Sequence, residues 1–294
     1  MSSIPYKKIH VVVNPASGKD EPIINTLNDV FHQYGVDWDV SITKKYGDAT
    51  EQAKAAIANG ADLVVGYGGD GTQHEIANAV LDNDGKVPMG ILPGGTGNGF
   101  AREMGIPKTL RPAVEVLCTS TKIRKIDVAQ VGDQFFIQRL YVGIEPEEQT
   151  SREMKDKYGV FAYAVSIYQR SKHPKEVTYK VTLDGESGEF RAVKVYVVNS
   201  GMMGSGYSIL KTYSIDDGLL DAFFLDKENS EAMSAAVDRF LNRDTERAHK
   251  YYRQCREITI DTDPNQPVWS DGEYLGRTPI TVKALPSVLP IVVP

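Results

Sequence analysis

The stretch of sequence that decides the fold is Val64-Val65-Gly66-Tyr67-Gly68-Gly69-Asp70-Gly71-Thr72. Its apolar first half predicts a buried strand over residues 63–67, and the apolar spacing beyond it predicts a helix over 74–81. Between the two, glycines let backbone N–H groups turn toward an anion because no Cβ atom is in the way, and the helix start adds a partial positive charge. The stretch therefore predicts a strand, a polyphosphate-binding loop and a helix.

Asp70 lies in the middle of this loop, where its carboxylate would repel a bare phosphate group. A Mg²⁺ ion, bound directly or through water, would bridge the two. A single glycine-rich turn is as often a plain connection as a binding site. The chain lacks the Gly-x-x-x-x-Gly-Lys-Ser/Thr run of the common P-loop, and no Gly-x-Gly-x-x-Gly follows its first strand. Nucleotide binding here must therefore be of another type.

Strands and helices alternate on both sides of this stretch. Parallel strands joined by crossover helices are the natural solution to such alternation, so the N-terminal part predicts a doubly wound α/β domain of three layers. The predicted strands cover residues 9–13, 38–43, 63–67 and 89–92, and the predicted helices cover 23–34, 50–59, 74–81 and 97–104.

Two further strand ends run into polar turns that contain glycine. Asn14-Pro15-Ala16-Ser17-Gly18-Lys19 follows the first strand, and Leu92-Pro93-Gly94-Gly95-Thr96-Gly97-Asn98 follows the strand at 89–92. In open parallel sheets, ligands bind outside the carboxyl ends of the strands. Three such turns on one edge predict a continuous crevice rich in hydrogen-bond donors, since loops that only connect elements need no shared chemistry.

After about residue 123 the pattern changes to short β-like runs with tight turns, which suit antiparallel pairing. These runs predict a β-rich second domain, a sandwich or a flattened barrel, interrupted by helices over 148–170 and 231–242. The first of these helices has an apolar face and is followed by a basic patch. That combination suits an anionic membrane surface and equally a helix packed on the second domain. The strands expected here cover residues 126–131, 135–141, 178–183, 190–199, 220–225, 257–261 and 279–282.

The composition narrows the classes of function. A net charge of -6 argues against a protein that mainly coats nucleic acid, because binders of the phosphate backbone normally carry a basic excess. Cys118 and Cys255 have no partners at metal-ligand spacing, so we expect packed thiols in a reducing compartment. No charge-free apolar run reaches about 18 residues. We therefore expect a cytoplasmic protein without a transmembrane segment, whose contact with a membrane is peripheral if its substrate is a lipid.

A fourth segment of interest is Trp269-Ser270-Asp271-Gly272-Glu273 in the β-rich part. Asp-Gly is first of all a hairpin signal. A near copy, Asp184-Gly185-Glu186, lies between two other predicted strands, which shows how common the pattern is. On its own this segment predicts a turn rather than a site.

Taken in order, these motifs resemble the catalytic-domain family of diacylglycerol kinases and sphingosine kinases, in the form of the soluble bacterial lipid kinases. The resemblance covers nearly the whole chain, and it is specific because of the order of the motifs rather than because of any single one. In the C-terminal half the resemblance rests on Asn199-Ser200-Gly201, Gly204-Ser205-Gly206, Asp216-Asp217-Gly218-Leu219-Leu220-Asp221 and Asp271-Gly272-Glu273. In the N-terminal half it rests on Asn14-Pro15-Ala16-Ser17-Gly18, Thr43 near Gly47-Asp48-Ala49, Gly68 to Thr72, and Pro93-Gly94-Gly95-Thr96-Gly97-Asn98.

The resemblance implies an ATP-dependent kinase that transfers the γ-phosphate to a lipid hydroxyl group, with a cleft between its two domains. The N-terminal nucleotide-binding domain, residues 1–124, would also contain the C-terminal strand 284–294. The lipid-binding, sandwich-like domain would cover residues 125–283. The residues that the resemblance assigns to ATP are Asn14, Thr43, Gly68, Gly69, Asp70, Gly71, Thr72, Gly95, Thr96 and Asn98.

The resemblance also assigns catalytic and metal-binding roles. Asp70 would organise Mg²⁺ through water, and either Asp271 or Glu273 would accept the proton of the substrate hydroxyl. Asp127 matches an acid that joins the magnesium network. A second, structural Mg²⁺ would bind Asp217 and the backbone carbonyl groups of Ser214 and Leu219.

Two departures from the family pattern keep alternatives open. Gly99 stands where soluble bacterial members often have Asp, and Gly143-Ile144-Glu145-Pro146-Glu147 replaces the usual Gly-Phe-Asp-Ala. One alternative is a small-molecule kinase similar to NAD kinases, which share Gly-Gly-Asp-Gly. The other is a nucleotide-binding protein of the same fold that has lost catalysis. The sequence does not name the lipid or the pathway, and it leaves a homodimer open.

Overall fold

The computed structural model of the chain describes residues 5–17, 20–143, 176–200, 214–225 and 252–294. The chain divides into two compact units, one made of Met1–Ile126 with Ser287–Pro294 and the other of Asp127–Pro286. The sequence places these two boundaries at residues 124 and 283. Two strands contribute residues to both units, β5 (Ile123–Val131) and β16 (Ile280–Val292).

The first unit is built on a parallel sheet with strands in the order β2 (Asp37–Ile42), β1 (Lys8–Val13), β3 (Leu63–Gly68) and β4 (Met89–Pro93). β3 and β4 are buried along their whole length, as is typical of apolar runs in a parallel sheet that is covered on both faces. The C-terminal end of β16 extends this sheet beside β4, where it pairs in parallel.

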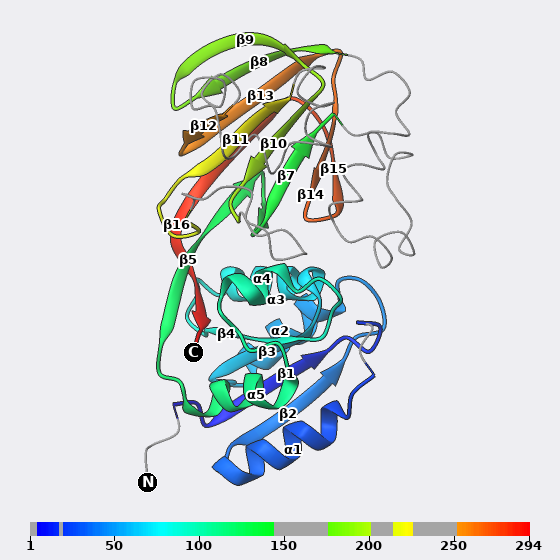
Figure 1. The fold of residues 1–294 in the computed structure, drawn as a ribbon, viewed down its shortest axis with the longest axis vertical. Coiled ribbons are helices and arrows are strands. Elements are labelled where there is room, and N and C mark those ends of the chain that lie inside the picture. Colours follow the sequence, from blue (N-terminus) through cyan, green and yellow to red (C-terminus); the bar gives the residue numbers. More distant parts are fainter. Residues whose placement is uncertain (1–4, 18–19, 144–175, 201–213, 226–251) are drawn as a thin grey trace. The chain divides into compact units, whose positions relative to one another are not determined.

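Helices cover both faces of this sheet (Figure 1). On one face α1 (Ile23–Tyr34) packs with α5 (Leu110–Thr119), and on the other α2 (Asp48–Ala58) packs with α3 (Asp70–Asp82). A short helix, α4 (Gly99–Glu103), follows β4. This arrangement is the doubly wound, three-layer α/β fold expected from the sequence, and the prediction is confirmed.

Local sequence explains the helices on the first face. α1 buries Leu27, Val30 and Phe31, and each such side chain contributes roughly 1.5–3 kcal/mol when it leaves water. The helix ends at Gly35, whose φ of 71° is a left-handed conformation that glycine adopts without strain. No helix was predicted over α5, although its buried residues follow helical spacing. They are Leu110, Ala113, Val114, Leu117 and Cys118.

The second unit is a sandwich of two sheets, as the sequence predicted. One sheet contains the order β16, β13 (Glu257–Asp263), β8 (Val177–Leu183) and β9 (Glu186–Ala192), with the pair of β5 and β6 (Gln134–Phe136) beside β16. The other has the order β12 (Tyr252–Cys255), β11 (Leu220–Leu225), β10 (Lys194–Val198), β7 (Arg139–Val142), β14 (Pro267–Ser270) and β15 (Glu273–Arg277).

Alternate residues of these strands face the interior of the sandwich, because side chains of a strand point to opposite sides of the sheet. In β10, Val195 and Val197 belong to the main apolar core. Tyr196, between them, packs against a separate cluster of Tyr141 and Trp269. The alternation of β10 thus separates the sandwich core from an aromatic cluster.

Several elements differ in extent from the predictions. α3 begins at Asp70 rather than at residue 74, so three residues of the predicted loop form its first turn. The strand predicted over 135–141 is two strands, β6 and β7, because the N–H groups of Ile137 and Gln138 bind the Asp271 carboxylate instead of a neighbouring strand. The helices predicted over 148–170 and 231–242 lie outside the described residues.

Candidate functional site

The first unit brings the predicted nucleotide-binding loops to one edge of its sheet. Backbone hydrogen bonds join the ends of neighbouring strands: Thr43 N donates to Val13 O at 3.0 Å, and Asn14 N donates to Tyr67 O at 2.9 Å. Gly94 N donates to Gly68 O at 3.0 Å. The carboxyl ends of β2, β1, β3 and β4 therefore form one continuous edge.

Two glycines allow the loops to approach closely. A Cβ atom on Gly68 would lie 2.4 Å from Thr72 Oγ1, and a Cβ atom on Gly95 would lie 2.6 Å from Gly69 Cα. The Thr72 hydroxyl group, which Gly68 admits, accepts a hydrogen bond from Asn14 Nδ2 at 3.1 Å. Absence of a side chain at these positions is thus what lets the loops after β1, β3 and β4 touch.

The start of α3 is suited to bind an anion. Its N-cap residue is Gly69, and no described side chain caps the helix. The first N–H groups of an α-helix have no partner within the helix, and the helix dipole places a partial positive charge there. Together with the glycine-rich turn, this end of α3 can bind a phosphate group.

Asn98 shapes the loop after β4. Its φ of 49° is in the left-handed region, which asparagine tolerates better than most residues. Its Oδ1 atom accepts a hydrogen bond from Gly95 N at 2.9 Å, and its Nδ2 group donates to Gly95 O. Thr96 is exposed within the same loop. Asn98 thus fixes the loop from within, while Thr96 is left at the surface.

Asp70 links the loop after β4 to α3. Its Oδ1 atom accepts a hydrogen bond from Phe100 N at 3.0 Å, and its Oδ2 atom accepts one from Gly99 N at 3.2 Å. These N–H groups belong to the start of α4, where a carboxylate is favourable. Gly99, which stands where an acid was expected, therefore donates its backbone N–H to the Asp70 carboxylate.

The donor chemistry of this edge fits Mg²⁺. Carboxylate and carbonyl oxygens are the ligands that Mg²⁺ prefers, and each carboxylate oxygen can accept more than one interaction. Within the described residues there is no cluster of three or more His, Cys, Asp or Glu side chains. Mg²⁺ usually binds through one or two carboxylates together with water and substrate phosphates.

The loop that contains Thr43 is held by two acids. Asp48 Oδ2 accepts hydrogen bonds from the N–H groups of Lys44 and Lys45, at 2.8 and 3.1 Å. The bond from Lys44 contributes most to lowering the pKa of Asp48. Glu75 of α3 accepts a hydrogen bond from Ala49 N at the start of α2, at 3.0 Å. The turn after β2 is therefore tied to α3, the helix that begins at the glycine-rich turn after β3.

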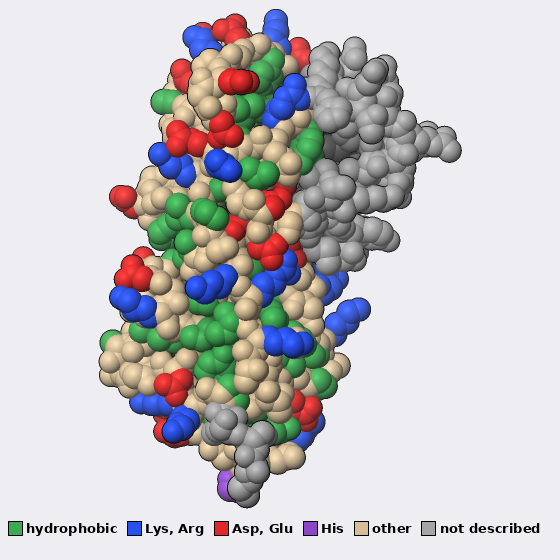
Figure 2. All heavy atoms as spheres, turned by 90° about the vertical axis from the view of Figure 1, so that its left-hand side faces the viewer, with side chains coloured by type: hydrophobic (Ala, Val, Ile, Leu, Met, Phe, Trp, Pro, Cys, Tyr) green, Lys and Arg blue, Asp and Glu red, His purple; other side chains and the backbone are tan. Residues whose placement is uncertain are grey.

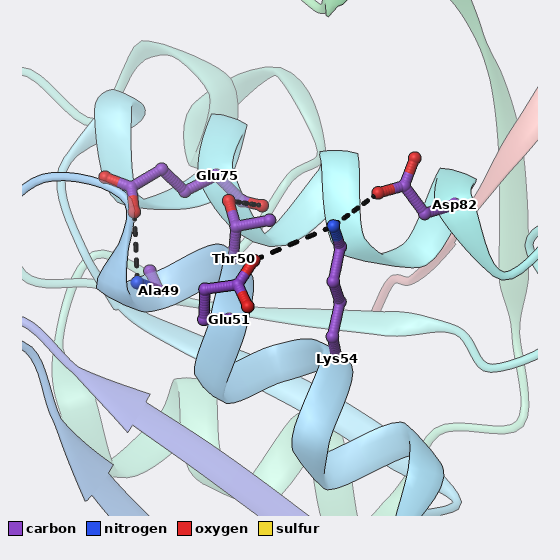
Figure 3. Close-up of polar contacts among 6 residues, drawn as sticks. All are labelled: Ala49, Thr50, Glu51, Lys54, Glu75 and Asp82. Atoms are coloured by element: carbon purple, nitrogen blue, oxygen red, sulfur yellow. Dashed lines mark hydrogen bonds and ion pairs between the residues drawn. The ribbon is translucent and has the colours of Figure 1, made fainter.

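Figure 3 shows how α2 and α3 are joined. Thr50 Oγ1 donates to the backbone O of Glu75 at 2.9 Å, and Lys54 Nζ lies 2.8 Å from Asp82 Oδ2. The ion pair of Lys54 is exposed, and such pairs contribute roughly 0–1 kcal/mol. Sequence reasoning missed Glu75, because nothing local to it reveals that α2 begins beside it.

The Tyr67 ring packs against the loop after β4. A Cβ atom on Gly94 would lie 2.7 Å from the Tyr67 ring, so this glycine allows the loop after β4 to rest on the ring. The Tyr67 hydroxyl group donates to Glu21 Oε1 at 2.8 Å. Burial raises the pKa of Tyr67, and the Glu21 carboxylate raises it further. The ring is a neutral support for the loops.

In the second unit, Asp271 is held by three backbone donors. Its Oδ2 atom accepts hydrogen bonds from Ile137 N at 3.0 Å and Gln138 N at 3.2 Å, and its Oδ1 atom accepts one from Arg139 N at 2.9 Å. These donors stabilise the ionised carboxylate and leave it little freedom to turn. Glu273, the other candidate base, is partly exposed at the start of β15.

The predicted structural metal site lies in the turn before β11. Asp127 Oδ2 accepts a hydrogen bond from Gly218 N at 2.5 Å, and Asp127 N donates to Ile215 O at 2.8 Å. Asp217 Oδ1 accepts one from Leu219 N at 3.0 Å. Ser214, Asp217 and Leu219 thus share one turn, which Asp127 anchors.

The described surface carries charges of both signs. Figure 2 shows Lys and Arg side chains interspersed with Asp and Glu side chains on the face that it presents. Neither sign dominates the described side chains on this face. In the parts of the chain that the structure describes, no helix combines the length and apolar character needed to cross a membrane.

Comparison with known proteins gives a family match in each half of the chain. Residues 8–131 match the family described as diacylglycerol kinase catalytic domain, and residues 139–293 match the YegS C-terminal NAD kinase beta sandwich-like domain. A diacylglycerol kinase from Staphylococcus saprophyticus is 25% identical over 279 residues, 93% of this chain and 91% of that protein. A Staphylococcus haemolyticus protein named as a lipid kinase is 31% identical over 237 residues, 78% of this chain and 76% of that protein. A crystal structure of a diacylglycerol kinase from Bacillus anthracis matches with a TM-score of 0.82 and 26% identity, covering 98% of each chain.

Proposed function

Because the chain belongs to the diacylglycerol kinase family, we propose that it transfers the γ-phosphate group of ATP to a hydroxyl group of a lipid. The observation that carries this proposal is the direct backbone contact between Gly69 and Gly95 at the edge of the parallel sheet. It joins two loops rich in N–H groups beside the start of α3. Such an arrangement binds a polyphosphate through backbone groups rather than through a P-loop lysine.

The kinase family implies ATP as the phosphate donor. In our proposal the backbone N–H groups of Gly69 and Gly71 bind the phosphate oxygens of ATP. Gly68 and Gly95 line the same site and let its loops come close together, the N–H of Gly95 being bonded to Asn98 Oδ1. Thr72, which accepts a hydrogen bond from Asn14, joins the start of α3 to the loop after β1. The remaining polar contacts to the nucleotide would come from Thr43, Asp70, Thr96 and Asn98.

A bound Mg²⁺ would neutralise the negative charge that the phosphate groups carry during transfer. We assign it to Asp70, and we assign a structural Mg²⁺ to Asp217, Ser214 and Leu219. That Asp127 joins the magnesium network stays a prediction from the resemblance. Asp70 also serves the fold, because it accepts the N–H groups of Gly99 and Phe100. Its carboxylate would therefore hold the metal and the loop at the same time.

Asp271 is the better candidate to orient the acceptor hydroxyl group. Three backbone N–H groups fix its carboxylate, so it offers a preorganised acceptor whose position costs little entropy at the moment of reaction. A carboxylate held in this way serves mainly to position the hydroxyl group. This suits phosphoryl transfer, in which positioning and charge neutralisation lower most of the barrier. Glu273 remains the alternative.

A lipid substrate requires contact with a membrane surface. In the first unit, the apolar side chains of Val40, Ile42 and Tyr46 are 39%, 52% and 67% exposed on β2 and the turn after it. The exposed cations Lys44 and Lys45 lie between Ile42 and Tyr46. Apolar side chains beside cations favour an anionic lipid surface, which supports peripheral membrane contact.

The test is a transfer assay with the full chain, γ-labelled ATP and Mg²⁺. The acceptors are mixed micelles that contain a diacylglycerol or a sphingoid base, and NAD⁺ in a parallel reaction. We expect label in a phosphorylated lipid on thin-layer plates. Label that appears only in NADP⁺ would assign the chain to a small-molecule kinase, and ATP binding without transfer would assign it to the non-catalytic alternative.

The Asp70→Asn variant is the control for this assay. We expect turnover to fall at least about 10²-fold, because the substitution removes a charge that positions the metal. An amide group also replaces one acceptor by a donor, which would face either Gly99 N or Phe100 N. Thermal unfolding of the variant should therefore be measured with its turnover. Turnover close to that of the parent would exclude Asp70 from the metal site.

A further inference from the structure

Asn199 is a buried polar residue at the end of β10. Its side chain is only 2% exposed, and its Nδ2 group donates to two backbone carbonyl groups, Ile137 O at 2.8 Å and Asp127 O at 3.0 Å. Its backbone N–H donates to Gln138 O at 2.9 Å. One residue thus satisfies three carbonyl groups in two separate segments of the second unit.

Two of these carbonyl groups belong to the peptide groups that hold Asp271. The carbonyl of Ile137 and the N–H of Gln138 form one rigid planar peptide group. Asn199 Nδ2 binds its oxygen, and Asp271 Oδ2 binds its N–H at 3.2 Å. Two sides of one peptide group are therefore held by Asn199 and by Asp271.

The next peptide group repeats the arrangement. The backbone N–H of Asn199 binds Gln138 O, and the N–H of Arg139, in the same peptide group, donates to Asp271 Oδ1 at 2.9 Å. Hydrogen bonds in such a chain polarise one another, so a donor on the carbonyl side strengthens the N–H on the other side. Asn199 therefore acts on two of the three donors that hold Asp271: on Gln138 N through its side chain, and on Arg139 N through its backbone N–H, which shares Gln138 O with Ser200 N.

Asn199 is also costly for folding. Among the described residues, its Oδ1 atom is buried without a hydrogen-bond partner, and the same is true of Gln138 Nε2 and Ser270 Oγ. Buried polar atoms of the described chain are otherwise mostly paired, as is usual in folded proteins. A leucine of similar size would bury no unpaired side-chain oxygen, but it would leave Ile137 O and Asp127 O without their side-chain donor. The donor side of the amide is therefore the part that the fold uses, and one of its two bonds goes to a peptide group that holds Asp271.

We propose that Asn199 is a positioning residue for Asp271, acting through the 137–138 and 138–139 peptide groups. It does not touch the substrate hydroxyl group. It sets the direction and donor strength of the N–H groups that hold the Asp271 carboxylate, and its bond to Asp127 O ties this support to the turn that contains Asp217. The kinetic part of this inference rests on the proposed function.

The test uses Asn199→Asp, which keeps the shape and the backbone N–H but removes the side-chain donor. We expect kcat for the lipid to fall at least about 30-fold, with the KM for ATP changed less than about threefold, because only the acceptor end is disturbed. In an Asp271→Asn background, Asn199→Asp should cost less than about threefold more, because residues that act as one unit are not additive. An equal loss in both backgrounds would show that Asn199 acts independently of Asp271.

Amide hydrogen exchange gives a readout that needs neither ATP nor lipid. In Asn199→Asp, the amide of Gln138 should exchange at least about tenfold faster than in the parent, because the side-chain donor to the carbonyl group of its own peptide, Ile137 O, is lost. Asn199→Ser, which keeps one donor, should lie between the two. Unchanged exchange at Gln138 would overturn the inference even if the parent protein transferred no phosphate to any lipid.

The matched control is Thr262→Val in the same unit. Thr262 is 5% exposed and its hydroxyl group accepts a hydrogen bond from Gln266 N at 3.0 Å, at the other end of β14 from Asp271. Its loss should lower the melting temperature while leaving kcat and the exchange of the Gln138 amide as they are. If Thr262→Val changed them as Asn199→Asp does, the effect would be general destabilisation and the inference would fail.

Discussion

Gly69 and Gly95 meet backbone to backbone: a Cβ atom on Gly95 would lie 2.6 Å from the Cα atom of Gly69. The two residues are far apart in sequence and end neighbouring parallel strands, β3 and β4. Real Cβ atoms essentially never approach another heavy atom so closely. A backbone atom cannot move aside by a change of rotamer, as the end of a long side chain can. The contact therefore fixes the distance between the two loops that we assign to the phosphate groups of ATP.

Gly95→Ala should destabilise the protein even in the absence of ATP, and it should also lower turnover. The added methyl group has to push the loops after β3 and β4 apart, so we expect at least about tenfold lower turnover together with a lower melting temperature. Gly71→Ala provides the comparison, because nothing lies within 4 Å of a Cβ atom there and its melting temperature should not fall. Calorimetry of both variants without nucleotide checks this, and equal stability of Gly95→Ala and the parent would contradict it.

Asp271→Asn and Glu273→Gln together identify the acceptor carboxylate. An amide at position 271 would turn an N–H group toward the donors of the 137–139 turn, so we expect kcat to fall at least about 10²-fold with ATP binding retained. Glu273→Gln should have a much smaller effect on kcat. Steady-state kinetics and ATP titration of both variants measure this. The reverse order of kcat values would assign the role to Glu273.

Gly99→Asp tests whether the missing acid matters for the metal. Gly99 N lies 3.2 Å from Asp70 Oδ2, so an acid there would stand beside Asp70 and raise the negative charge of the proposed metal site. A higher ligand charge strengthens binding of a divalent cation. We therefore expect the Mg²⁺ concentration for half-maximal activity to fall at least about threefold. The measurement is a magnesium titration of turnover. An unchanged titration would mean that position 99 has no part in metal binding.

Both cysteines should be unreactive in the folded protein. Cys118 and Cys255 are buried, and burial, with nearby acids as a second cause, raises the pKa of each thiol to about 12. A thiol reacts as its thiolate, so at pH 8 only a minute fraction of either group is reactive. We expect no rapid labelling by a thiol reagent in buffer and two equivalents in denaturant. Rapid labelling of the native chain would show that one of these thiols becomes accessible.

The sequence was most informative where structure depends on neighbouring residues. The apolar run before Gly68 and the helical spacing after Thr72 are local patterns, and they predicted β3 and α3 within a few residues. The same holds for the alternation that predicted a doubly wound domain followed by a sandwich. Even the missed helix, α5, carried its signal in Leu110, Val114 and Leu117.

The partners of the candidate site residues could not be found in this way. Asp70 binds the N–H groups of Gly99 and Phe100, 29 and 30 positions away, and Asp271 binds a turn more than 130 positions away. Residue type and order suggested that both acids matter. Neither property reveals which donors hold them.

By itself, the sequence determined the fold class and the two-part organisation, because these follow from periodicity, and it predicted the phosphate-binding loops from glycine at strand ends. Only the tertiary structure decided which atoms those loops and acids contact. The direct approach of Gly95 to Gly69, the hold of the 137–139 turn on Asp271 and the support of that turn by Asn199 all join segments distant in sequence. Such contacts are selected by the packing of whole strands and helices, whose outcome no local pattern contains.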